Sequence, residues 1–152
     1  MIIEYTIDKS RIKKILTSDC LWERIRDYAI SKDEFTPDVV RFHHFVLSVD
    51  GEDIGLYMFE KLNTKTLVIH PAILKKFRKA FSYKSYEAVK ESIIEKTIGI
   101  TNLVCFIPTC YKDCINFALH FGFSKVGVLP ASSEREGKIL DQVIMSKRLW
   151  AD

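Results

Sequence analysis

The stretch that decides the fold runs from Thr66 to Ser92 and reads TLVIHPAILKKFRKAFSYKSYEAVKES. Its first half is a short apolar run that favours a β-strand and ends at His70-Pro71. A turn with four cations and no glycine follows, and helical spacing then predicts a helix over residues 79–97. A helix N-terminus presents free amide groups and a positive dipole, so a strand, a basic turn and a helix can hold phosphate. Two interpretations stay open, a phosphate-binding turn and a solvated basic turn.

The composition bounds the class of protein. With 152 residues the chain is long enough for one domain that buries roughly two-thirds of its unfolded surface. The net charge of +3 is too small to predict nucleic-acid binding by itself. No apolar run approaches the roughly 20 residues of a membrane span, and the N-terminus lacks the residue order of a signal peptide. We therefore expect a cytoplasmic protein without membrane contacts.

Four cysteines raise the question of a metal site: Cys20, Cys105, Cys110 and Cys114. A structural zinc site usually needs two ligand pairs at matched spacing, and the chain offers only one close pair, at 110 and 114. The favoured interpretation is therefore reduced thiols that pack as small hydrophobic side chains, with no metal.

The pattern before residue 66 predicts a strand, two helices and a hairpin. Residues 2–7 alternate as in a strand, and Asp8 or Ser10 can cap the helix that follows. A second helix begins near Asp19, with an apolar stripe at Leu21, Trp22, Ile25, Tyr28 and Ala29. Residues 31–41 read as a loop. Two β-rich runs then flank Asp50-Gly51, a strong hairpin signal.

After the decisive stretch, the pattern predicts a buried strand, a helix and two final strands. The apolar run TNLVCFIP looks like a central strand, residues 110–121 are helical, and Gly122 lies just past the helix end. The last strands, FSKVGVLP and KILDQVIMSKRLW, flank a polar loop. The predicted fold class is α/β (α+β), in a single domain over residues 1–152. Its mixed, mostly antiparallel sheet has six or seven strands with helices on both faces.

This order resembles the GNAT superfamily of acyl-CoA-dependent N-acyltransferases over nearly the whole chain, most specifically from Thr66 to Val128. The resemblance depends on three segments: LVIHP with the basic turn and helix that follow it, NLVCFIP, and CYKDCINFALHFGF with its Gly122-Phe123 pair. The segments KKFRKAF and ALHFGF are closest to GNAT-like proteins encoded by tailed bacteriophages.

The resemblance implies that acetyl-CoA is the cofactor and that its pyrophosphate lies at the turn and the helix start. Carried over residue by residue, the cofactor-binding positions are Val68, Ile69, His70, Phe77, Arg78, Lys79, Ala80, Phe81, Ser82 and Tyr111. The family usually shows [Gln/Arg]-x-x-Gly-x-[Gly/Ala] here, because the ligand approaches the backbone. With Arg78 in the first place, Phe81 and Tyr83 stand where small residues are usual.

The catalytic candidates are His70, Tyr111 and Glu60. An attacking amine must be deprotonated, and His70 has an intrinsic pKa suited to that task, whereas Glu60 is the alternative carboxylate base. His43 and His44 are further candidates, of which only one can face a given side of the strand. Many family members carry a Tyr as general acid where this chain has Ala118. Tyr111 and Cys114 are the two substitutes, and for each of them a packing role stays an equal alternative.

Two functional hypotheses follow from the resemblance. The first is an N-acetyltransferase that acts on an amine of a small molecule or a protein. The second is a catalytically degenerate GNAT-fold phage protein with a virion, assembly or host-interaction role, whose partners are phage or host proteins and whose location is the host cytoplasm. Nucleic acid is not an expected partner of either.

Overall fold

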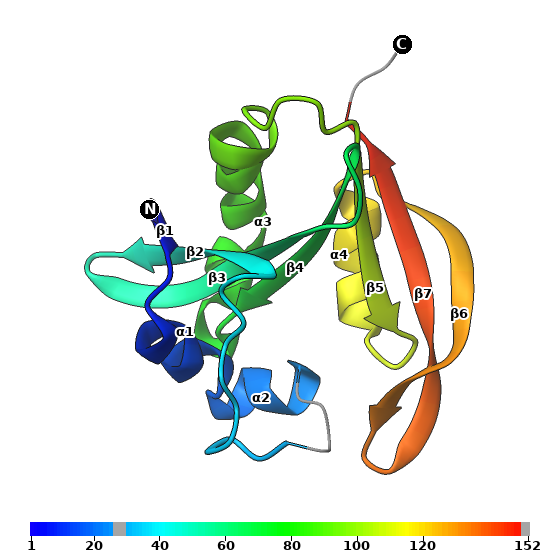
Figure 1. Cartoon of the computed structure of the whole chain (residues 1–152), viewed down its shortest axis with the longest axis horizontal. Helices are drawn as coiled ribbons and strands as arrows, with labels where there is room; N and C mark the ends of the chain where they lie inside the picture. The colour runs from blue at the N-terminus through cyan, green and yellow to red at the C-terminus, as the bar shows by residue number, and fades with distance from the viewer. Residues whose placement is uncertain (26–29, 150–152) are drawn as a thin grey trace. The chain divides into compact units, whose positions relative to one another are not determined.

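The computed structural model describes residues 1–25 and 30–149 (Figure 1). Its elements are, in chain order, β1 (Ile2–Thr6), α1 (Lys9–Leu16), α2 (Asp19–Ile25), β2 (Phe42–Val49), β3 (Glu52–Lys61), β4 (Thr66–Ile73), α3 (Lys75–Val89), the π-helical turn η1 (Lys90–Ile94), β5 (Asn102–Pro108), α4 (Lys112–His120), β6 (Ser124–Arg135) and β7 (Lys138–Arg148).

The seven strands form one sheet in the order β1-β2-β3-β4-β5-β7-β6. β4 and β5 run parallel, whereas the pairs β1-β2, β2-β3, β5-β7 and β6-β7 are antiparallel. The predicted fold class is therefore confirmed. The chain divides into a first unit, Met1–Lys61 with Ile69–Gly99, and a second unit, Leu62–Val68 with Ile100–Asp152.

In the first unit, the hairpin between β2 and β3 turns where the sequence predicts it. Asp50 has φ +51° and Gly51 has φ +81°, the left-handed pair that a tight two-residue hairpin turn requires. The register sets Phe42 opposite Glu60 and Val46 opposite Leu56, which puts these four side chains on one face of the two strands.

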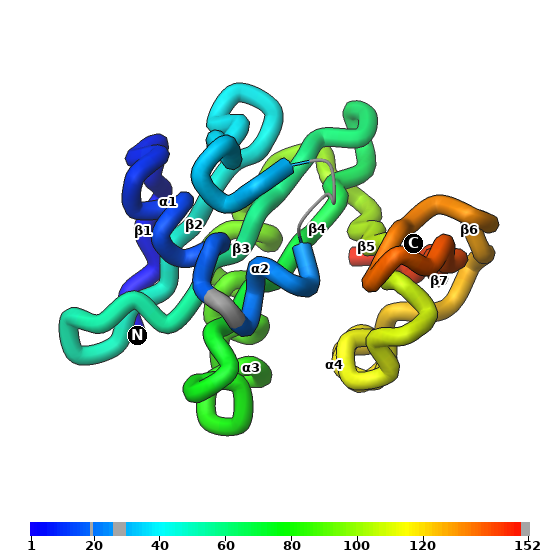
Figure 2. The backbone as a smooth tube through the Cα atoms, turned by 90° about the horizontal axis from the view of Figure 1, so that it is seen from below, coloured from blue at the N-terminus to red at the C-terminus, as the bar shows by residue number. Residues whose placement is uncertain are grey.

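Helices cover both faces of this part of the sheet (Figures 1 and 2). On one face, Val46, Leu56 and Ala72 pack in a buried cluster with Ile12, Ile15 and Leu16 of α1 and Leu21 of α2. On the other face, the Tyr57 hydroxyl lies 3.2 Å from the Ser85 Oγ of α3. The apolar periodicity of α1 and the alternation of β2 and β3 thus place packed side chains on both faces of this part of the sheet.

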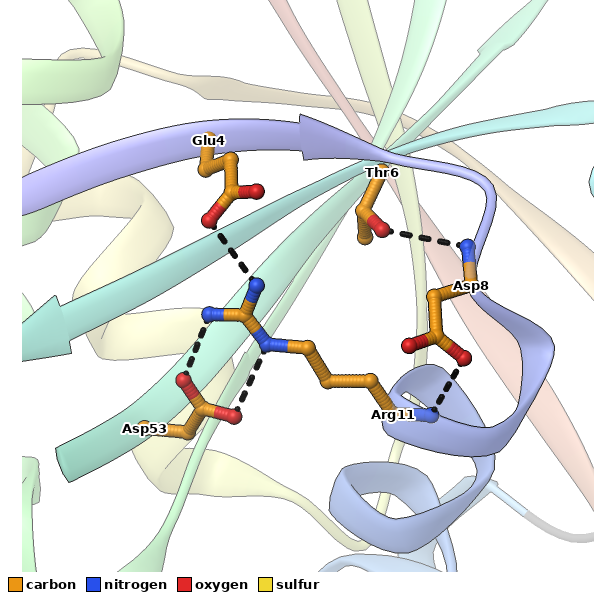
Figure 3. Close-up of polar contacts among 5 residues, drawn as sticks. All are labelled: Glu4, Thr6, Asp8, Arg11 and Asp53. Atoms are coloured by element: carbon orange, nitrogen blue, oxygen red, sulfur yellow. Dashed lines mark hydrogen bonds and ion pairs between the residues drawn. The ribbon is translucent and has the colours of Figure 1, made fainter.

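A polar clamp fixes α1 to the strands (Figure 3). Arg11 donates from Nε (3.1 Å) and Nη2 (2.8 Å) to the two carboxylate oxygens of Asp53 on β3, and from Nη1 to Glu4 on β1 (2.8 Å). Asp8 caps the helix by accepting from the backbone N–H groups of Ser10 and Arg11. Of the two predicted capping residues, Asp8 is the one that acts.

The backbones of β3 and β4 approach closely at Gly55. A Cβ added there would lie 2.3 Å from the carbonyl oxygen of Ala72 and 2.8 Å from the Cα of Ile73. One residue further along β4, the N–H of Leu74 donates to the carbonyl of Ile54 at 2.9 Å. Gly55 therefore lets β3 hold the end of β4 at the point where α3 begins.

In the second unit, β5, β7 and β6 form an antiparallel group, and the first residues of β4 pair with β5 from Thr66↔Asn102 to Val68↔Val104. The predicted parallel neighbourhood of these two strands is confirmed. α4 lies beside β5 and β7 (Figures 1 and 2). Its C-terminal carbonyl of Phe121 accepts from Lys147 Nζ at 2.6 Å, and Gly122 takes φ +77° just beyond the helix.

Three sequence predictions need correction or restriction. β4 continues through Pro71 to Ile73, so His70 lies inside the strand and not at its end. The helix predicted over 79–97 begins at Lys75 instead. Tyr28 and Ala29, predicted on the stripe of α2, lie outside the described residues. None of the helices in the described ranges is long and apolar enough to cross a membrane.

Candidate functional site

The unusual group on β4 is the imidazole of His70. Its Nε2 atom is buried and has no hydrogen-bond partner among the described residues. The ring forms an edge-to-face pair with Phe42, with 5.9 Å between centroids and 79° between planes. Burial lowers the pKa of His70; the nearby Glu60 carboxylate acts in the opposite direction, and Arg41 adds to the lowering. The imidazole is therefore neutral near pH 7, and no described protein group bonds to its Nε2 atom.

Glu60, the second catalytic candidate, lies in the same neighbourhood. Its carboxylate accepts from Arg41 Nε at 2.7 Å, and the side chains of Glu60 and Arg41 are 22% and 62% exposed. The Arg41 guanidinium also lies over the ring of Phe42, 5.0 Å from its centroid. Because Phe42 contacts His70 as well, the structure brings His70, Glu60, Phe42 and Arg41 together on the face of the sheet that α1 covers.

The two adjacent histidines of β2 separate as the strand alternation predicts. His43 is exposed and lies 6.1 Å from the ring of Tyr5. His44 is 2% exposed on the opposite face, where burial lowers its pKa, and its ring lies 6.3 Å from Phe42. His44 thus shares the face of His70, whereas His43 has no place in this group.

The basic turn of the sequence analysis is the first turn of α3. Only Leu74 connects β4 to the helix, and it provides no side-chain cap. Arg78 donates from Nε to the carbonyl of Ile73 (2.9 Å) and from Nη2 to the carbonyl of Cys20 (3.4 Å). The N–H of Lys75 donates to the Cys20 sulfur at 3.4 Å. β4 and α3 are therefore joined by a single residue, and the start of α3 is in hydrogen-bond contact with Cys20 of α2.

The other predicted cofactor positions lie along this helix and on β4. Lys79 and Ala80 are exposed, Ser82 is half-buried, and the rings of Phe77 and Phe81 pack against each other at 6.1 Å. Val68 and Ile69 are buried. Lys76 forms an ion pair with Glu52 and lies over the Phe77 ring. The residues fit an anion in charge and helix polarity, but the Lys75 amide is already bound to Cys20.

Tyr111, the remaining candidate, belongs to the second unit. It is the N-cap residue of α4, its N–H donates to the carbonyl of Pro108 at 3.0 Å, and the Arg135 guanidinium lies 5.9 Å from its ring centroid. Ala118 is 5% exposed on the same helix, so the position at which the resemblance implies a tyrosine holds a side chain without a hydroxyl.

The cysteines differ in their surroundings. Cys105 is buried, and burial, with a smaller contribution from Cys114, raises its pKa to about 12. Cys110 is exposed. Among the described residues, no three His, Cys, Asp or Glu side chains gather as metal ligands. Of the four cysteines, Cys105 is the buried one, as expected of a small hydrophobic residue, whereas Cys20 is a contact of α3 that the sequence did not reveal.

Sequence reasoning also missed Arg41 and Phe42. The alternation in FHHF puts Phe42 and His44 on one face, and this signal could have identified Phe42. Nothing in the sequence signals Arg41, because its contacts depend on the register between β2 and β3.

Comparisons with known proteins support the fold. A scan of family profiles and a search of curated sequences both give no match. A spermidine N-acetyltransferase from Vibrio cholerae, solved with CoA and spermine, has a TM-score of 0.76 at 13% identity, over 97% of this chain and 94% of that one. A ribosomal-protein-alanine N-acetyltransferase from Brucella melitensis has 0.73 at 15%, over 98% and 100%. A Salmonella typhimurium protein solved with acetyl-CoA has 0.72 at 16%, over 100% and 95%. At such low identities the similarity establishes architecture and not chemistry. The chain has the GNAT fold, the fold of these N-acetyltransferases.

Proposed function

We propose that the chain is an N-acetyltransferase that moves an acetyl group from acetyl-CoA to an amine, with His70 as the general base. The observation that carries the proposal is the buried Nε2 of His70, which has no described hydrogen-bond partner. A base needs a neutral form and an open lone pair at working pH, and burial favours the neutral imidazole.

Each residue of the proposed site has a role that follows from its chemistry. His70 Nε2 accepts one proton from the ammonium form of the acceptor, which frees the nitrogen lone pair for attack. Acetyl-CoA, when bound, would supply the acetyl group as a thioester: a C–N bond would form as the C–S bond breaks, and the departing thiolate would take the second proton that the nitrogen loses. Its phosphates are assigned to the cationic start of α3, where Lys75, Arg78 and Lys79 provide positive charge. Ala118 carries no acidic proton, so we expect slower turnover than in enzymes with a positioned acid.

The test is the variant His70→Gln, which keeps a polar side chain and removes the base. We expect kcat to fall by about 10²–10⁴-fold, the usual contribution of a positioned acid or base. The matched control is His43→Gln, because His43 is exposed on the opposite face. In the wild type, the acidic limb of kcat/KM should lie below the ordinary histidine pKa of about 6.5. Equal losses of kcat in both variants would refute the role of His70.

The second candidate is a phage-encoded GNAT-fold protein that has lost catalysis and acts through protein contacts. The observation that favours a loss of catalysis is the junction between β4 and α3, with its single residue Leu74 and its Lys75 amide bound to Cys20. Calorimetry with acetyl-CoA and with CoA separates the two candidates. No binding at millimolar ligand would exclude the acetyltransferase and leave the second candidate.

A further inference from the structure

The Arg41 side chain is bound as a ligand cation would be. Its guanidinium lies over the face of Phe42 at 5.0 Å from the ring centroid, and its Nε donates to the Glu60 carboxylate at 2.7 Å. An aromatic face and a carboxylate are the two groups that bind organic cations in proteins. Phe42 and Glu60 are directly opposed in the β2-β3 register, so rigid strands hold both.

This cation site adjoins the base of the proposed reaction. The rings of Phe42 and His70 form an edge-to-face pair with centroids 5.9 Å apart, and the charges of Glu60 and Arg41 both act on His70. The unpartnered Nε2 of His70 is a second, independent sign that a ligand group belongs here, because a buried ring nitrogen normally has a hydrogen-bond partner.

We propose that Arg41 occupies, in the ligand-free chain, the subsite for a second positive charge of the acyl acceptor. The acceptor is then a short aliphatic diamine or polyamine: one nitrogen lies at His70 and is acetylated, while the other displaces Arg41 from Phe42 and Glu60. This inference rests on the proposed function for the reaction, but it concerns binding that occurs without acetyl-CoA.

The charges favour a cationic acceptor over an anionic one. A free arginine beside the base would attract a carboxylate-bearing acceptor, but the Glu60 carboxylate already pairs with Arg41. Arg41 is 62% exposed and can leave at small cost, since an exposed ion pair contributes little stability. Glu60 is 22% exposed and stays on its strand, so the displaced arrangement presents a carboxylate next to a neutral imidazole.

Three acceptors that share a four-carbon chain test the inference: 1,4-diaminobutane, butylamine and 4-aminobutyrate, whose far ends are cationic, apolar and anionic. With the wild type, kcat/KM for the diamine should exceed that for butylamine by about tenfold or more, and 4-aminobutyrate should be the poorest. Glu60→Gln should bring the ratio of diamine to butylamine close to one. A preference for 4-aminobutyrate would overturn the inference and make Arg41 an anion anchor.

Calorimetry with 1,4-diaminobutane alone separates this inference from the proposed function. Arg41→Gln removes the internal competitor and should tighten diamine binding several-fold, whereas Lys125→Gln, an equal charge change at an exposed site of the second unit, should leave it unchanged. Diamine binding with no acetyl transfer would support the subsite and refute the enzyme. Acetyl transfer to all three amines at equal kcat/KM would support the enzyme and refute the subsite. Weaker diamine binding by Arg41→Gln would refute the displacement.

Discussion

Replacement of Gly55 by alanine tests how closely β3 and β4 approach each other. The new Cβ would lie 2.3 Å from the Ala72 carbonyl oxygen, so one strand must move by about 1 Å to reach ordinary contact. Overpacking of this kind costs about 1–3 kcal/mol. The φ of +154° adds strain of about 1–2 kcal/mol for an L-residue. We therefore expect the free energy of unfolding to fall by about 2–5 kcal/mol.

For a chain of this length, that loss lowers Tm by about 4–20 °C. Thermal unfolding by circular dichroism and equilibrium unfolding in urea measure it. Gly51→Ala is the matched control: Gly51 has φ +81°, but nothing lies within 4 Å of an added Cβ, so it loses only the strain term. If Gly55→Ala lowers the free energy of unfolding no more than Gly51→Ala does, the two strands do not approach each other closely at Gly55.

Three further predictions concern the histidines, the contact of α2 with α3, and the clamp of α1. The pKa of His44 and of His70 is lowered by burial, so below pH 6.5 the unfolded chain binds protons that the folded chain does not. The free energy of unfolding should then fall as pH drops below about 6.5, by up to about 1.4 kcal/mol per pH unit for each imidazole, and urea titrations that show no decrease down to pH 5 would contradict this. Cys20→Ala removes the sulfur that accepts from the first amide of α3, so calorimetry should show that CoA binds this variant several-fold more tightly than it binds the control Cys110→Ala, which alters an exposed thiol. Equal Kd values for the two variants would place the CoA phosphates elsewhere. Arg11→Met should lower the free energy of unfolding by about 1–3 kcal/mol, because it leaves two half-exposed carboxylates without their bidentate and single charge-assisted hydrogen bonds; a loss below about 0.5 kcal/mol would class the clamp with ordinary surface ion pairs.

Local signals in the sequence predicted much of the fold. The hairpin at Asp50-Gly51 and the cap at Asp8 depend on residues next to each other in the chain, and both are present. The parallel pairing of β4 and β5 followed from the β-α-β order, because such a crossover joins neighbouring parallel strands. These features require no knowledge of distant contacts.

The start of α3 was misplaced because four cations suggested a turn. Lysine, arginine and alanine are good helix formers, and nothing between Leu74 and Lys79 breaks a helix. The strand also passes through Pro71, which the sequence analysis took as its end. A breaker inside a strand is tolerated where its missing N–H is not needed in the ladder, and only tertiary structure decides that.

The candidate site was predicted residue by residue but not as a group. His70 and Glu60 were named from their chemistry, whereas the arrangement around Phe42 depends on three strands and their registers. A one-residue change of register would move Phe42 to the other face. The hydrogen-bond partners of Arg41 and Cys20 are distant in the chain, so no local signal in the sequence could identify these two residues.

The one-residue link between β4 and α3 also affects how the chain responds to heat. A flexible glycine loop at this place would lose about 1–2 kcal/mol of conformational entropy per ordered residue on folding, and Leu74 alone avoids most of that loss. Strand and helix are then expected to loosen together as one cooperative segment, and their amides should exchange with deuterium at similar rates. Because Leu74 alone joins the two elements, the chain has no flexible loop at this junction that could change its shape around a ligand.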